Sequence, residues 1–135
     1  MSDNINRKLW EAALAGDEAL VSQLIDQATV DWRDRSDYTA LHPAAYGGHT
    51  PVVTRLLDAG WSLEARSGAG WTPLNKAAAG GDLETVKYLL VREADMDTQD
   101  DDKSTPLHYA SNSGHNEVIK TLLQCGANQL QRILP

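Results

Sequence analysis

The sequence predicts an all-α solenoid in which four copies of a short helical unit stack along one axis. Three observations lead to this fold class: a motif of small and apolar residues recurs every 33 residues, helix-starting residues open each motif, and glycines close it. Periods of roughly 20–50 residues are typical of repeat proteins, whose units bury their apolar faces only against their neighbours. About three or more stacked units are then enough to form a core.

Three segments of the chain carry the full motif, which consists of a threonine, a leucine, a pair of small residues and a glycine. Apolar residues downstream of each motif repeat at the same period. The motif residues are Thr39-Ala40-Leu41-His42, Ala44-Ala45 and Gly48; Thr72-Pro73-Leu74-Asn75, Ala77-Ala78 and Gly81; and Thr105-Pro106-Leu107-His108, Ala110-Ser111 and Gly114. The downstream residues are Val53, Leu56 and Leu57; Val86, Leu89 and Leu90; and Ile119, Leu122 and Leu123. A fainter copy with Leu9, Ala12, Ala13 and Gly16 lies 32 residues upstream of the first full one.

The residue types around each motif fit a helix that starts at the threonine and stops at the glycine. A threonine hydroxyl can accept from the free N–H groups of a first helical turn, and a proline directly after it lacks only an N–H that the helix does not use. Glycine adopts the left-handed backbone that ends many helices. We therefore expect the first helices to begin at Thr39, Thr72 and Thr105 and to end at Gly48, Gly81 and Gly114, and the second helices to end at Gly60 and Gly126.

A 33-residue unit that carries Thr-Pro-Leu-His, Ala-Ala and Gly-His resembles the ankyrin repeat. The resemblance covers residues from about 7 to 128, and three full copies in register make it specific. It implies that each unit consists of a helix, a tight turn, a second antiparallel helix and a projecting β-hairpin loop. On this basis we expect a single ankyrin-repeat domain over residues 1–135, with repeats at about 6–37, 38–70, 71–103 and 104–135.

The two ends of the chain depart from the motif. Arg7-Lys8-Leu9-Trp10 stands at the motif position of the first copy and, with its polar neighbours, suits an N-terminal cap. The last copy carries Ser111-Asn112-Ser113 on its first helix, and we interpret it as the C-terminal cap. The tail residues Leu130, Ile133 and Leu134 have two interpretations: they fold back over the exposed end of the stack, or they fray.

Two internal positions also differ from the pattern. Glu93 stands where Gly60 and Gly126 stand in the neighbouring copies, so a left-handed backbone at Glu93 would carry about 1 kcal/mol of strain. Trp61 replaces the small residue that Ala94 represents in the next copy. Its ring either covers the edge of the stack or is exposed to solvent.

Composition excludes several classes of partner. The formal net charge is -7, whereas nucleic acids and anionic membranes require clustered lysines and arginines, so we expect neither as a partner. No run of 18 apolar residues exists that could span a membrane. Cys125 is the single cysteine, and the sequence shows no signal peptide, so we expect a reducing compartment: the cytoplasm, with the nucleus possible.

The four histidines have structural interpretations. His42 and His108 take the fourth place of the motif, where the resemblance implies a clasp that is hydrogen-bonded to the motif threonine and nearby backbone rather than a general base. Asn75 takes this place in the middle copy, which weakens or changes the clasp. His49 and His115 open the second helices, where capping or solvation is favoured over metal binding.

No other residue cluster indicates catalysis or a cofactor. The acidic stretch from Asp95 begins like a calcium loop, but Asp100 stands where glycine is needed and Pro106 where glutamate is needed. We interpret it as a solvated acidic tip. Cys125 is expected in the turn after the last helix, with no basic residue nearby to activate it. We therefore expect no catalytic residue, no metal and no cofactor, and we do not expect an enzyme.

The resemblance implies one long, shallow concave face, formed by the loop tips and the first helices, that suits protein surfaces. Tyrosine, tryptophan and arginine, which are enriched in interface hot spots, gather there. Basic residues in the middle predict an acidic or acidic–aromatic patch on the partner, and the acidic third loop predicts basic partner residues. Alternatively, the arginines pair with local acids such as Asp34, Asp37 and Glu64 and only keep the surface soluble. The expected partner-binding residues are Arg33, Arg35, Tyr38, Tyr46, Arg66, Trp71, Lys76, Asp101, Asp102, Tyr109 and Asn112, and Leu14 and Pro43 lie on the same face.

These features predict a protein–protein interaction module, either an adaptor or a stoichiometric inhibitor, that is a monomer when unbound. Two alternatives remain. The chain is a scaffold or spacer fragment of a longer ankyrin-repeat protein, or, less favoured, an enzyme with a deep pocket of convergent titrating groups. Polar outer faces at both ends of the stack would favour a complete unit, and apolar outer faces a fragment or a self-associating stack.

Overall fold

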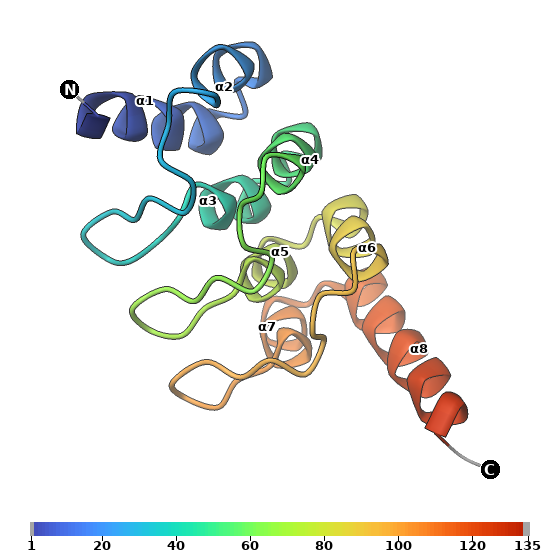
Figure 1. The fold of residues 1–135 in the computed structure, drawn as a ribbon. Coiled ribbons are helices and arrows are strands. Elements are labelled where there is room, and N and C mark those ends of the chain that lie inside the picture. The colour runs from blue at the N-terminus through green and yellow to red at the C-terminus, as the bar shows by residue number, and fades with distance from the viewer. Residues whose placement is uncertain (1, 134–135) are drawn as a thin grey trace.

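The computed structural model describes residues 2–133 of the chain, with side chains for residues 4–126. In this part the chain forms eight α-helices in four successive pairs (Figure 1). The pairs are α1 (Ser2–Ala15) with α2 (Glu18–Leu24), α3 (Leu41–Tyr46) with α4 (Thr50–Asp58), α5 (Pro73–Gly80) with α6 (Leu83–Val91), and α7 (Pro106–Ser113) with α8 (Asn116–Ile133).

The helices form two rows. The first helices α1, α3, α5 and α7 contact one another in succession, the second helices α2, α4, α6 and α8 do the same, and each helix also packs on its pair partner. Loop 1 (residues 25–40), loop 2 (59–72) and loop 3 (92–105) connect the pairs and project to the same side of the stack (Figure 1). The expected unit boundaries at 37/38, 70/71 and 103/104 fall within these loops. The all-α repeat solenoid is thus confirmed.

Side-chain capping starts the first helices. Thr72 Oγ1 accepts from the backbone N–H of Asn75 at 3.2 Å, and Asn75 Oδ1 accepts from the backbone N–H of Thr72 at 3.0 Å. A reciprocal box of the same kind starts α7. The second unit has Ala40 where the other two have a proline, so α3 begins one residue later, at Leu41, with Ala40 as its N-cap. Thr39 Oγ1 still accepts from Leu41 N at 3.3 Å. The motif threonines therefore satisfy free N–H groups in all three units.

Glycines end the first helices as expected. Gly48, Gly81 and Gly114 have φ values of 73°, 79° and 73°, which lie in the left-handed region. The same conformation recurs without glycine at Glu93, with φ of 70°, so the expected left-handed backbone at this position is confirmed.

The core lies between the two rows of helices. Burying a leucine or valine side chain contributes about 1.5–3 kcal/mol, so the repeated buried leucines and valines stabilise the stack. Ala45 and Ala78 are fully buried, whereas Ser111, at the same position of the last unit, is exposed because no unit follows it in the described part of the chain. Trp61 is only 4% exposed, so its ring is covered and not solvated. The largest fully buried apolar residues are Leu9, Leu41, Leu56, Leu74, Leu89, Leu122, Val21, Val52, Val53, Val86 and Val118.

The expected β-hairpins are not confirmed, since residues 2–133 contain no strand. Each loop instead has one closing backbone bond across five residues and one turn bond across four residues, which are too few bonds for a β-ladder. Further bonds join neighbouring tips, so the three loops lie side by side. The closing bonds run from Asp34 N to Tyr38 O at 3.0 Å, Ser67 N to Trp71 O at 2.9 Å and Asp100 N to Ser104 O at 3.0 Å; the tip bonds run from Gly68 N to Ser36 O at 3.0 Å and Asp101 N to Ala69 O at 2.9 Å.

The C-terminal helix is longer than expected. α8 runs without a break from Asn116 to Ile133, so the expected left-handed turn at Gly126 is wrong. Glycine permits a left-handed turn but does not impose one, and residues 2–133 contain no further unit that would require the chain to reverse here. Cys125 therefore lies within α8 and not in a turn. The backbone continues along α8 up to Ile133 and does not fold back over the stack (Figure 1), while Leu134 lies outside the described residues.

No helix among the described residues combines the length and the apolar character needed to cross a membrane.

Candidate protein-binding surface

His42 is a structural clasp between the second unit and loop 2. Its Nδ1 accepts from the backbone N–H of Thr39 at 3.0 Å, so the ring proton resides on Nε2. Nε2 in turn lies 3.0 Å from Ala65 O and 2.7 Å from Trp71 O, and both carbonyls accept from it. The ring is fully buried, and this desolvation lowers its pKa below the usual 6.5. The clasp that the resemblance implied is confirmed, with His42 neutral.

The other clasp positions differ from His42. Asn75 keeps the bonds to its motif threonine, but its Nδ2 is buried and has no hydrogen-bond partner. Its shorter side chain does not reach the next loop. His108 binds the backbone N–H of Thr105 at 3.0 Å and is exposed, since no described loop follows its unit.

Trp10 takes the clasp position in the first unit, and the sequence reasoning missed it. The 32-residue offset of the first copy places Trp10 opposite His42, which is the signal that could have found it. Its Nε1 donates to Tyr38 O at 3.3 Å, and Tyr38 corresponds by the 33-residue period to Trp71, whose carbonyl accepts from His42. Trp10 therefore fixes the loop residue Tyr38 against α1.

His49 and His115 cap helices of the preceding unit rather than their own. His49 Nε2 donates to Leu14 O at 3.1 Å, in the last turn of α1, and His115 Nε2 donates to Ala79 O at 3.1 Å, in the last turn of α5. The end of a helix leaves carbonyls without intrahelical partners, which these imidazoles satisfy. The described residues contain no group of three or more His, Cys, Asp or Glu residues placed to hold a metal ion.

Arg33 and Arg66 join neighbouring loops instead of pairing with acids. Arg33 Nη1 donates to Asp37 O at 2.7 Å and to Arg66 O. Arg66 Nη1 donates to Gly70 O at 3.2 Å and to Gln99 O at 2.6 Å. Residues 33, 66 and 99 are one period apart, so each guanidinium binds the same position of the next unit. Both side chains therefore hold the row of loops, and neither forms an ion pair with a local carboxylate in the described part of the chain.

Five of the expected partner-binding residues gather into one aromatic cluster around Lys76. The ring centroids of Trp71 and Tyr109 are 4.2 Å apart with the planes tilted by 41°. The Lys76 ammonium lies 4.1 Å from the Trp71 ring centroid, 4.8 Å from that of Tyr38 and 5.5 Å from that of Tyr46. These distances are within the range of cation–π attraction. The aromatic cluster thus unites side chains from loops 1 and 2 and from α3, α5 and α7 on one face.

Four other expected residues lie outside this cluster. Asp101 and Asp102 are exposed at the tip of loop 3, and Asn112 is exposed on α7. Arg35 is exposed at the tip of loop 1. No hydrogen bond or ion pair of the described residues joins these four side chains to the aromatic cluster.

A shallow apolar groove of about 190 Å³ adjoins the aromatic cluster on the first two units. Leu14 and Tyr46, which are 51% and 54% exposed, stand among the most exposed large apolar residues of the described chain. Exposed apolar residues that share one concavity mark interaction sites more often than isolated ones do. The groove is lined by Trp10, Leu14, Tyr38, His42, Pro43, Tyr46 and Lys76.

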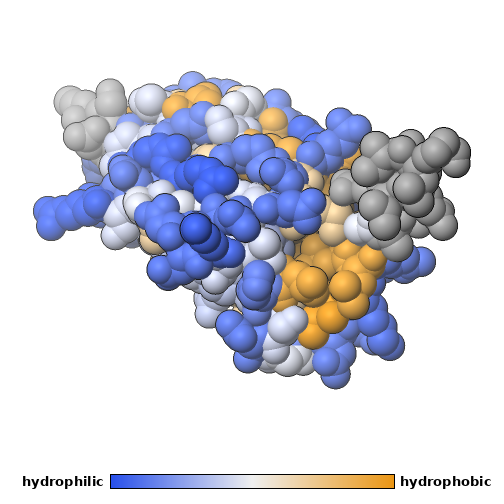
Figure 2. Space-filling view, turned by 90° about the horizontal axis from the view of Figure 1, so that it is seen from below, coloured by the Kyte–Doolittle hydropathy of each residue, from blue (hydrophilic) through white to orange (hydrophobic). Residues whose placement is uncertain are grey.

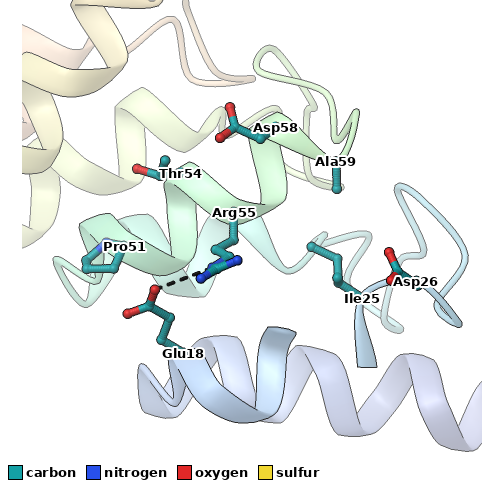
Figure 3. A pocket seen from close by; sticks show the side chains of 8 residues that line it. All are labelled: Glu18, Ile25, Asp26, Pro51, Thr54, Arg55, Asp58 and Ala59. Carbon is teal, nitrogen blue, oxygen red and sulfur yellow. Dashed lines mark hydrogen bonds and ion pairs between the residues drawn. The ribbon is translucent and has the colours of Figure 1, made fainter. Parts of the chain in front are cut away.

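A larger groove of about 570 Å³ lies between α2 and α4, on the row of second helices (Figure 3). Arg55 extends from α4 towards α2, and its Nε binds Glu18 Oε1 at 3.4 Å (Figure 3). Asp26 and Asp58 stand apart at the rim, with Ile25 between Asp26 and the arginine (Figure 3). This open groove brings no nucleophile to a base, so its arrangement suggests no reaction.

Comparison with known proteins agrees with the repeated helix pairs. Among curated proteins, the Homo sapiens Ankyrin repeat domain-containing protein 39 is 38% identical over 65 residues, which is 47% of this chain and 36% of that protein. The aligned part therefore spans about a third of that relative's length. The family described as "Ankyrin repeats (3 copies)" matches residues 9–100 and again residues 62–133. These two matches together cover nearly the whole chain, which therefore belongs to the ankyrin-repeat family.

Proposed function

We propose that the chain is an adaptor or stoichiometric inhibitor that holds a protein partner on its concave face, the surface formed by the first helices and the loop tips. Ankyrin repeats are generally protein–protein interaction modules, and the family is typically non-enzymatic. The observation that carries the proposal is the aromatic cluster, in which Tyr38, Tyr46 and Trp71 surround Lys76 and Tyr109 packs on Trp71. Aromatic residues in such a position are the usual hot spots of protein interfaces.

The charges around the aromatic cluster support a partner with two kinds of patch. Lys76 in the aromatic cluster and Arg35 at the tip of loop 1 present positive charge, to which an acidic patch of the partner would fit. Asp101 and Asp102 at the tip of loop 3 would meet basic residues of the same partner. Arg33 and Arg66 contribute positive charge as well, but their main role is to hold the loops in place.

The test is affinity capture from an extract of the source organism with three forms of the protein: wild type, Trp71→Ala and Tyr88→Ala. Tyr88 is a half-buried tyrosine on α6, in the other row of helices, and serves as the control. We expect at least one protein that wild type and the Tyr88 variant retain and the Trp71 variant loses. With that protein purified, Trp71→Ala should cost more than about 1 kcal/mol, or roughly fivefold in Kd. Equal retention by all three folded forms would refute the concave face as the binding site.

A second candidate, a spacer in a longer ankyrin-repeat stack, is favoured by the C-terminal end of the stack. Leu123 is 55% exposed there, whereas Leu57 at the same position of the second unit is only 6% exposed. Figure 2 shows an apolar patch on the right side of the view, on a face that is otherwise mostly hydrophilic. Light scattering would separate the candidates: the proposed monomer has a mass of 14.7 kDa, and a self-associating stack has a multiple of it.

A further inference from the structure

We propose that the partner binds the concave face through an acidic side chain next to a bulky apolar side chain. The apolar side chain enters the apolar groove between α1 and α3, and the carboxylate meets the ammonium of Lys76. This inference rests on the proposed function and names the chemistry that the same face recognises. It also places the partner's apolar anchor on the first two units, next to the aromatic cluster.

The groove supplies the apolar half of the site. Leu14 and Tyr46 expose about half of their surface to water on its walls, and Pro43 and Trp10 complete it. Covering these surfaces with an apolar side chain removes them from water, which is the main favourable term in protein association. A volume of about 190 Å³ is enough for one large side chain but small for a whole ligand. The groove therefore suits a single anchoring residue of a protein.

Lys76 supplies the charged half. It is the sole permanently charged residue among those that line the groove, and no ion pair in the described part of the chain includes it. Three aromatic rings hold its ammonium in place and keep water from part of it. A carboxylate that reaches it from a partner would form a charge-assisted hydrogen bond in a partly desolvated place, where such bonds are strongest.

Other ligands fit this site less well. A cationic ligand would be repelled by Lys76, which already occupies the faces of the rings. A nucleic acid would find one lysine in the groove of a protein with a net charge of -7, whereas phosphate backbones require several cations in a row. A neutral apolar segment would cover the groove but leave the Lys76 ammonium partly desolvated without a partner.

The distances set the spacing of the two partner residues. The ammonium is 4.8 Å from the ring of Tyr38 and 5.5 Å from that of Tyr46, and both rings line the groove. The acid and the anchor must therefore be close to each other on the partner. Residues about three or four apart on a helix, or about two apart on an extended segment, meet this requirement.

The experiment uses a phage-displayed library of random 12-residue peptides as the probe, selected on the whole chain. We expect enriched peptides to carry Asp or Glu within about four residues of Leu, Ile, Phe or Trp. Binding of synthetic peptides is then measured by fluorescence anisotropy to wild type, Lys76→Gln, Lys76→Arg and Leu14→Ser. Lys87→Gln is the matched control, because Lys87 is an exposed lysine on α6, in the other row of helices.

We expect Lys76→Gln to weaken binding about tenfold and Lys76→Arg to change it less than about threefold. Leu14→Ser should weaken binding by a similar factor to Lys76→Gln, and Lys87→Gln should have no effect. Replacing the peptide's acid by its amide should also cost about tenfold, with no further loss when Lys76→Gln is combined with it. Lys76→Glu should in turn bind a peptide whose acid is replaced by lysine. Urea unfolding confirms that each variant is folded.

The outcomes separate this inference from the proposed function. Peptides that bind the concave face, as shown by their loss with Trp71→Ala, but need neither the acid nor Lys76 would overturn the inference alone. Peptides that bind equally to Trp71→Ala, Lys76→Gln and Leu14→Ser would overturn both. A library that yields no peptide dependent on Lys76 would also overturn the inference.

Discussion

Replacing Asn75 by histidine should stabilise the protein, because it supplies the one clasp that the stack lacks. In the first unit the Trp10 side chain donates to Tyr38 O at 3.3 Å, and in the second unit the His42 side chain donates to Trp71 O at 2.7 Å. In the third unit the equivalent carbonyl is that of Ser104, and the buried Nδ2 of Asn75 has no partner. The junction between the third unit and loop 3 is therefore weaker than the two before it.

The expected gain in stability follows from the buried Nδ2 of Asn75, which has no hydrogen-bond partner. A buried donor without a partner costs about 1–3 kcal/mol, and a satisfied hydrogen bond contributes about 0.5–1.5 kcal/mol net. A histidine at position 75 replaces the unpaired Asn75 Nδ2 by a ring N–H that donates to Ser104 O, but the larger ring requires some repacking of its neighbours. We expect Asn75→His to raise the free energy of unfolding by about 1–2 kcal/mol, which corresponds to roughly 3–6 °C in Tm for a chain of this size. The reverse change His42→Asn should lower it by about 1–3 kcal/mol.

Urea unfolding at pH 7.5, followed by circular dichroism, measures both changes. Asn112→His is the matched control, because it makes the same substitution at an exposed site on α7 and should change stability by less than about 0.5 kcal/mol. The double variant with Asn75→His and His42→Asn moves the clasp from one junction to the other and should lie near wild type. Destabilisation by Asn75→His, or no effect of His42→Asn, would refute the reasoning that bonds to the next loop hold the units together.

Three further predictions concern single positions. Glu93→Gly should stabilise by about 0.5–1 kcal/mol in the same assay, because it relieves the left-handed φ of 70°, whereas the control Glu84→Gly within α6 should destabilise by about 1 kcal/mol. Gly126→Ala should raise the thermal midpoint by a few degrees, because alanine stabilises the α8 helix by about 0.5–1 kcal/mol relative to glycine. The new Cβ would meet Met96 Cε at an ordinary contact distance of 3.5 Å. An unchanged midpoint would count against a helical Gly126. Burial lowers the pKa of His42 in the folded state. The contribution of His42 to stability is therefore complete above the unfolded pKa of 6.5 and is lost as the pH falls from 6.5 towards the folded pKa, so the urea midpoint should decline between pH 8 and pH 5. A decline that persists unchanged in His42→Asn would exclude His42 as its source.

Much of the fold is predictable because the 33-residue period repeats the same local chemistry. The threonine boxes and the left-handed glycines follow from residue type at a fixed position and do not depend on distant partners. The same rule holds at Glu93, although this residue departs from the glycine of the motif. Its backbone is left-handed like that of Gly60, because the chain leaves each of these second helices in the same way. The aromatic cluster follows as well, since its members sit at motif-related positions that the stack brings to one face.

The remainder was not predictable because it depends on what lies next to a residue in space. Gly126 stands at a turn position, but no described unit follows that would require the turn, so α8 continues. Arg33 and Arg66 stand near Asp34, Asp37 and Glu64 in the sequence, yet their guanidinium groups reach carbonyls one period away. The sequence predicted partner binding for both arginines, with pairing to these acids as the alternative, whereas stacking places the same position of the next loop within reach of each guanidinium.

The same bonds that order the loops bear on how the concave face binds. Arg33 and Arg66 tie each loop to the next, and the Trp10 and His42 clasps hold the backbone of Tyr38 and Trp71, so the backbone that carries two of the rings around Lys76 is ordered before any partner arrives. A surface that is ordered in advance loses less conformational entropy on binding.

This ordering differs along the stack. The apolar groove lies on the side with intact clasps, whereas Tyr109 lies beyond the unclasped junction at Asn75 and is held to loop 3 by its own hydroxyl, which donates to Asp100 Oδ2. Arg66→Ala removes bonds to Gly70, Gln99 and Thr98, so any loss of affinity in that variant must be corrected for its loss of stability.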